Sequence, residues 1–106
     1  MNKLTEKKDL HDQVHHLEKL VDRLQTAMGL AIDPEHAMLY TKALRELITS
    51  TRMTIAMGTD KEAQAQIGHL REFVVLKINE CEDNYRRKAA ELDEIRMLGV
   101  RIGATV

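Results

Sequence analysis

Four side chains that could bind an anion stand at helical spacing in the middle of the chain. This basic stripe consists of Lys42, Arg45, Thr49 and Arg52. On a helix, residues three, four and seven positions apart share one face, and arginine guanidinium groups match phosphate and carboxylate oxygens. The stripe predicts a surface for a nucleotide, a nucleic-acid backbone or an acidic partner. Its simpler interpretation is a solvated face, or pairing with acidic residues of another helix or subunit.

A pair of histidines offers a metal-binding hypothesis. His11 and His15 stand four residues apart, a spacing that lets one helical face chelate a transition metal. The residue after His11 is Asp12, whereas zinc peptidases have a glutamate there. No pair of cysteines accompanies the histidines, because Cys81 is the single cysteine. We therefore expect a polar helix face here and no metal cofactor.

Carboxylates towards the C-terminus offer a second metal-binding hypothesis. Glu80 and Asp83 form one pair, and Glu91 and Glu94 form another, at a spacing with which paired carboxylates hold magnesium in some all-helical nucleotide hydrolases. Such sites draw carboxylates from facing helices, whereas both pairs lie on one predicted helix. Arg87 also lies one turn from Asp83 and from Glu91. Ion pairing within the helix is the interpretation we favour, and a metal-dependent hydrolase is the alternative.

The chain carries no motif for nucleophilic catalysis. Cys81 lies on an apolar stripe, where a thiol usually packs as a small hydrophobic group. A glycine-rich phosphate loop and a nucleophile elbow are both missing from the sequence. We therefore predict that the protein is not an enzyme.

Three helices must position these side chains. In the first, over residues 5–28, apolar residues recur in alternating steps of four and three, which is the heptad pattern of coiled coils and helical bundles. They are Leu10, Val14, Leu17, Val21, Leu24 and Met28. Gly29 follows directly and is expected to end this helix in the left-handed conformation.

Helix-capping residues mark where the next two helices start. Asp33 and Pro34 suit the N-cap and first positions of a helix over 34–57, which Gly58 would end. Thr59 and Glu62 form a capping box at the start of a third helix over 60–98. The run at 49–54 is poor in helix formers, so we expect bending or fraying there.

The third helix is too long for one chain to cover. At 1.5 Å per residue it would reach about 58 Å, whereas a compact chain of this length is roughly 33 Å across. Its apolar stripe continues through the excess, so another subunit is expected to cover it. The alternative is a break near Gly68 or over 82–84 that folds the helix back into a four-helix monomer. The tail over 99–106 is expected to fray, or else to dock on a partner.

These observations predict an all-α single domain over 1–106: an antiparallel helical hairpin and a long third helix, assembled with another subunit into a helical bundle. The assembly is most simply a homodimer. The residues predicted to form the interface are Leu17, Val21, Leu24, Tyr85, Ala89, Leu92 and Ile95.

Composition narrows the function further. The formal net charge is -1 and only 3% of residues are aromatic, so neither a global positive field nor stacking platforms favour nucleic-acid binding. The single cysteine suits a reducing compartment, so we expect a cytoplasmic protein, and no apolar run is long enough to span a membrane. We predict a self-associating interaction protein that binds or regulates another macromolecule, most simply a protein. Nucleic-acid or nucleotide binding through the basic stripe is the alternative.

Overall fold

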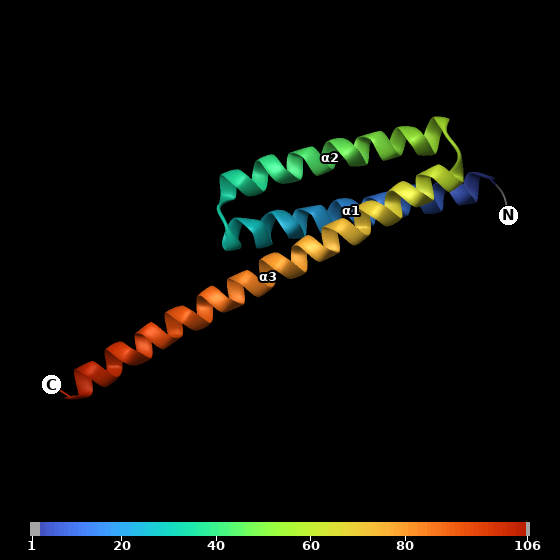
Figure 1. Cartoon of the computed structure of the whole chain (residues 1–106). Helices are drawn as coiled ribbons and strands as arrows, with labels where there is room; N and C mark the ends of the chain where they lie inside the picture. The colour runs from blue at the N-terminus through green and yellow to red at the C-terminus, as the bar shows by residue number, and fades with distance from the viewer. Residues whose placement is uncertain (1–2, 106) are drawn as a thin grey trace.

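The protein is a bundle of three helices, of which the last projects far beyond the other two (Figure 1). The computed structural model describes residues 3–105, and the side chains of residues 6–103. The helices are α1 (Lys3–Ala31), α2 (Pro34–Met57) and α3 (Asp60–Thr105), joined by two short turns. The predicted all-α class is confirmed.

The core forms around α1. Helix α2 runs back along α1, and α3 then runs in the direction of α1 and contacts it along most of its length (Figure 1). The heptad residues of α1 are all buried in the core. Leu17, Val21 and Leu24, predicted to form an interface with another subunit, therefore lie inside the chain's own core. The reason is that α2 and α3 together cover the whole apolar side of α1.

Local capping residues define both turns, as predicted. The Asp33 carboxylate accepts a hydrogen bond from the backbone N–H of His36 at 2.7 Å, and Pro34 occupies the first turn of α2. At the next turn, the backbone N–H of Glu62 donates to the Thr59 hydroxyl at 3.1 Å. These bonds satisfy amide groups that the helix itself leaves without partners.

Removing the Asp33 cap should destabilise the fold modestly. We expect Asp33→Ala to lower the free energy of unfolding by about 1 kcal/mol, because the His36 amide loses its acceptor. Asp33→Asn keeps an acceptor at that position and should be nearly neutral. Urea denaturation of the two variants checks this prediction, and equal losses in both would contradict it.

Two helix ends differ from the prediction. Helix α1 continues through Gly29 to Ala31, and no glycine in the described residues has a positive φ angle. The backbone N–H of Ile32 closes the last turn on the Met28 carbonyl at 2.8 Å. Helix α3 likewise continues through Gly99 to Thr105, so the frayed-tail prediction is wrong up to that residue; Val106 lies outside the described part. Glycine in a helix costs only about 1 kcal/mol, which its neighbours can offset.

The threonine-rich end of α2 is a continuous helix. The hydroxyls of Thr49, Thr51 and Thr54 each donate to the carbonyl four residues earlier, at 3.1–3.2 Å. Such bonds satisfy the hydroxyl without taking an amide away from the helix. They account for a regular helix over a run whose intrinsic propensity is low.

Helix α3 does not fold back. Its 46 residues are unbroken, and the molecule measures 75 × 27 × 15 Å with a radius of gyration of 20.1 Å, against about 13 Å for a compact chain of this length. The contacts of α3 with α1 end near Lys88, whose ammonium group donates to the Ala31 carbonyl. From residue 90 to residue 103 every side chain is exposed. We call residues 90–105 the C-terminal extension.

Candidate interaction surfaces

The arginines of the basic stripe bind carboxylates of α1. The Arg45 guanidinium lies 2.9 Å from the Asp22 carboxylate and 2.8 Å from the Gln25 side-chain oxygen. It also donates to the Thr41 hydroxyl at 3.1 Å. Arg45 therefore connects α2 to α1 through two partners, Asp22 and Gln25, whereas its bond to Thr41 lies within α2.

The rest of the stripe follows the same pattern. Arg52 forms an ion pair with Glu18 and lies 3.5 Å from Nδ1 of His11, while the Thr49 hydroxyl bonds within α2. Lys42 is exposed and has no polar partner among the described residues. Of the four side chains, only Lys42 is left to meet an anion. The geometry therefore supports the interpretation that the basic stripe pairs with acidic residues of another helix.

The predicted metal-binding residues do not converge. His11 and His15 are both exposed on α1. Of the carboxylates on α3, Glu80 pairs with Lys77 at 3.0 Å and Asp83 pairs with Arg86 at 3.3 Å. No three histidine, cysteine or acidic side chains gather within the described residues in a way that could hold a metal ion.

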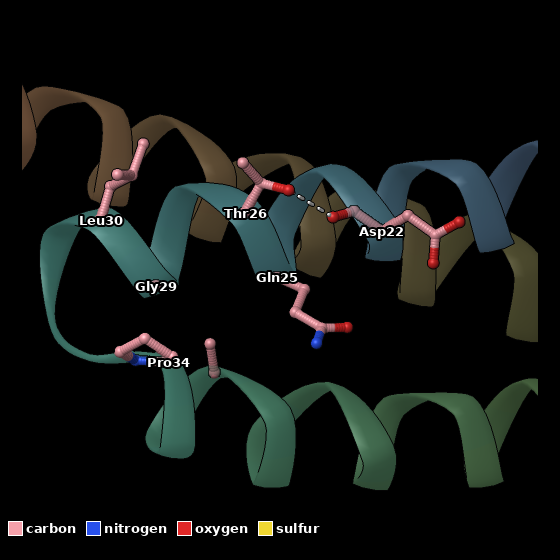
Figure 2. A pocket seen from close by; sticks show the side chains of 7 residues that line it. Asp22, Gln25, Thr26, Gly29, Leu30 and Pro34 are labelled. Atoms are coloured by element: carbon pink, nitrogen blue, oxygen red, sulfur yellow. Dashed lines mark hydrogen bonds between the residues drawn. The ribbon is translucent and has the colours of Figure 1, made fainter.

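A hollow of about 560 Å³ lies between the end of α1 and the start of α2 (Figure 2). Its polar side chains already have partners: Asp22 and Gln25 accept from Arg45, and the Thr26 hydroxyl donates to the Asp22 carbonyl at 3.4 Å. A ligand would have to displace these bonds. The hollow is therefore a poor candidate for a binding site.

A second hollow, the α2/α3 groove, is almost entirely apolar and has a volume of about 400 Å³. The rings of Tyr40 on α2 and Phe73 on α3 stack across it, with centroids 6.4 Å apart. The helical patterns of the sequence do not predict this groove, because Phe73 lies outside the apolar stripe of α3. The sequence feature that could have indicated the groove is the set of large apolar residues that lie outside the apolar stripes of the helices. The groove is lined by Tyr40, Ala43, Leu44, Leu47, His69, Leu70 and Phe73.

The C-terminal extension is the second apolar surface. Tyr85 and Ala89, predicted to form an interface, lie just before it; Tyr85 is exposed and Ala89 is partly buried. Leu92 and Ile95, also predicted, are exposed within it. The large apolar side chains of the extension are Leu92, Ile95, Met97, Leu98, Val100 and Ile102, each between 54% and 65% exposed.

Cys81 is buried in the core. Burial raises the pKa of its thiol above the ordinary value of 9.0, and Lys77 partly opposes this effect. A thiol with a raised pKa remains protonated at neutral pH, and the thiolate is the reactive form. Cys81 thus packs as a small apolar group, as its place on the stripe predicts.

Alkaline pH should lower the stability of the fold through Cys81. The thiol keeps its proton to a higher pH in the folded state than in the unfolded state. Its contribution to the free energy of unfolding is therefore fully present below pH 9.0 and is lost as the pH rises through the pKa of the folded state. We expect the free energy of unfolding to fall less steeply with rising pH in Cys81→Ala than in the unmodified chain. Urea denaturation at about pH 8 and about pH 10 measures both slopes; identical slopes would contradict the prediction.

No family model, curated protein or solved structure matches the chain. None of the described helices combines the length and the apolar character needed to cross a membrane.

Proposed function

We propose that the protein is a small, non-enzymatic helical interaction protein that associates with itself through the C-terminal half of α3 and binds or regulates another macromolecule. A homodimer is the assembly proposed, since two copies form the simplest closed assembly. A cytoplasmic setting belongs to the proposal, because the buried Cys81 has no disulfide partner.

The exposed apolar side chains of the C-terminal extension carry this proposal. Helix α1 covers the apolar stripe of α3 only as far as Lys88, yet the stripe continues through Leu92 and Ile95. Burying one such side chain contributes about 1.5–3 kcal/mol. Contiguous exposed apolar surface of this kind is typical of a protein-binding site.

The polar groups add support for a role in binding and not in catalysis. The arginines of the basic stripe bind α1, and the carboxylates Glu80 and Asp83 bind neighbouring cations of α3. The pairs between α1 and α2 stabilise the bundle and those within α3 stabilise that helix, each surface pair by at most about 1 kcal/mol. Of the surfaces left for a partner, the α2/α3 groove is almost entirely apolar, and the C-terminal extension carries large exposed apolar side chains beside its charged ones.

Light scattering over a concentration series tests the proposal. We expect a molar mass approaching twice 12.1 kDa at micromolar concentration, with dissociation on dilution. A mass of 12.1 kDa at every concentration would overturn self-association, and with it the proposed role of the extension.

A further inference from the structure

We infer that the C-terminal extension of one copy lies antiparallel in the α2/α3 groove of a second copy, with the two-fold axis at Asn84. The inference rests on the proposed self-association and adds the occupant, the direction and the register. One contact, made twice by symmetry, would then cover both apolar surfaces of the chain.

A single row of side chains on α3 connects the groove to the extension. It begins beside the groove and continues to the end of the extension in steps of three and four residues that average 3.6, the repeat of a straight α-helix. We call it the self-complementary row. Its members are Gln66, Leu70, Phe73, Lys77, Glu80, Asn84, Lys88, Glu91, Ile95, Leu98 and Ile102.

Rotation about Asn84 places apolar residues against apolar residues at both ends of the row. Leu98 then faces Leu70 of the second copy, and Ile95 faces Phe73 of the second copy. Leu70 and Phe73 line the α2/α3 groove, and Ile95 and Leu98 are 64% and 55% exposed in the single chain. Exposed apolar side chains of the extension thus meet an almost entirely apolar hollow of the body.

The same rotation places opposite charges together near the centre of the row. Glu91 faces Lys77 of the second copy. Lys88 faces Glu80 of the second copy, so its ammonium group would exchange the bond to the Ala31 carbonyl for an ion pair. In the single chain Lys77 and Glu80 pair only with each other, at 3.0 Å, and Glu91 has no ion-pair partner among the described residues. A parallel arrangement would bring Glu91 against Glu91 and Lys77 against Lys77, which like-charge repulsion disfavours. Charge therefore selects the antiparallel direction.

Asn84 would lie against its own copy at the two-fold axis. A side-chain amide both donates and accepts hydrogen bonds, so two such groups can pair with each other. A single asparagine in a helical interface commonly fixes the register. Asn84 is exposed in the single chain, so this position is free to meet a partner.

The body of the protein leaves this face accessible. Helix α1 packs on the neighbouring stripe, which includes Val74, Ile78 and Cys81. Helices α2 and α3 diverge from their shared turn towards the start of α2, and the extension projects beyond both other helices (Figure 1). Each extension can therefore reach the groove of the other copy without displacing a helix.

A charge swap tests the pairing of Glu91 with Lys77. We expect Glu91→Lys and Lys77→Glu each to raise the dimer dissociation constant about tenfold, since each creates two repulsive contacts per dimer. The double variant restores opposite charges and should return to within a few-fold of the unmodified chain. Asp93→Lys is the matched control: Asp93 lies on the opposite side of α3, so association should be unchanged.

Cross-linking tests the direction and the register in a Cys81→Ala background. A short bis-maleimide should link Asn84→Cys to itself, whereas Asn79→Cys, on another side of α3, should remain unlinked. Leu98→Cys alone should also remain unlinked but should link to Leu70→Cys when the two variants are mixed. Circular dichroism confirms that each variant is folded.

The outcomes separate the two proposals. If the unmodified chain is monomeric, self-association fails and this arrangement fails with it. If the chain is dimeric but Leu98→Cys links to itself and the charge swap restores nothing, the antiparallel arrangement alone is overturned. A dimer with linked Asn84→Cys and a restoring swap supports both.

Discussion

Replacing Leu17 with aspartate should unfold the chain at room temperature. Leu17 is 1% exposed at the centre of α1, between α2 and α3. An unpaired carboxylate there loses its hydration and also forfeits the packing of the leucine, which alone is worth about 2–5 kcal/mol. Domains of this size are stable by only about 5–15 kcal/mol. Far-UV circular dichroism and thermal melting measure the loss of helix.

The matched control is the same substitution at an exposed leucine. Leu39 on α2 is 62% exposed, so Leu39→Asp should leave the melting curve almost unchanged. If Leu17→Asp melts like the unmodified chain, α1 is not the centre of the core. If Leu39→Asp also loses its structure, the effect reflects a general intolerance of negative charge and not the burial of Leu17.

The sequence predicts the helices well because short-range chemistry defines them. The carboxylate of Asp33 and the hydroxyl of Thr59 cap backbone amides only three residues away. The heptad spacing of the apolar residues of α1 predicts which face of that helix is buried. Each of these signals lies within one or two helical turns, so a single chain displays it without reference to the fold.

Helix ends at glycine were less predictable. Gly29 and Gly99 both suit a left-handed end, yet both helices continue through them. A glycine raises the free energy of a helix by only about 1 kcal/mol, and tertiary contacts decide on that scale. At Gly29, α1 closes its last turn with the bond from Ile32 to Met28, and α2 starts directly afterwards.

The remaining features could not be predicted because they depend on partners that are distant in the sequence. The basic stripe was visible as a pattern, but the acids that bind Arg45 and Arg52 lie on another helix, at Asp22 and Glu18. Likewise, the heptad of α1 does not reveal whether the same chain or another subunit covers it. The α2/α3 groove depends on the divergence of two helices, which no local pattern encodes.

Replacing Ile95 with alanine should have the largest effect on self-association. Under the proposed antiparallel pairing, two copies of Ile95 are buried per dimer, so the loss counts twice. At about 0.8 kcal/mol per buried methylene, the dimer should lose roughly 2–5 kcal/mol, a rise in the dissociation constant of about 30-fold to several thousandfold. Sedimentation equilibrium measures this constant directly.

Met97→Ala provides the control for this substitution. Met97 is 56% exposed in the same segment, but it lies on a different side of α3 from the self-complementary row. Alanine is the best helix former, so neither variant should lose helix. If both variants dissociate equally, general hydrophobicity of the extension drives association, and the face carrying Ile95 has no special role. A selective effect at Ile95 assigns the interface to that face.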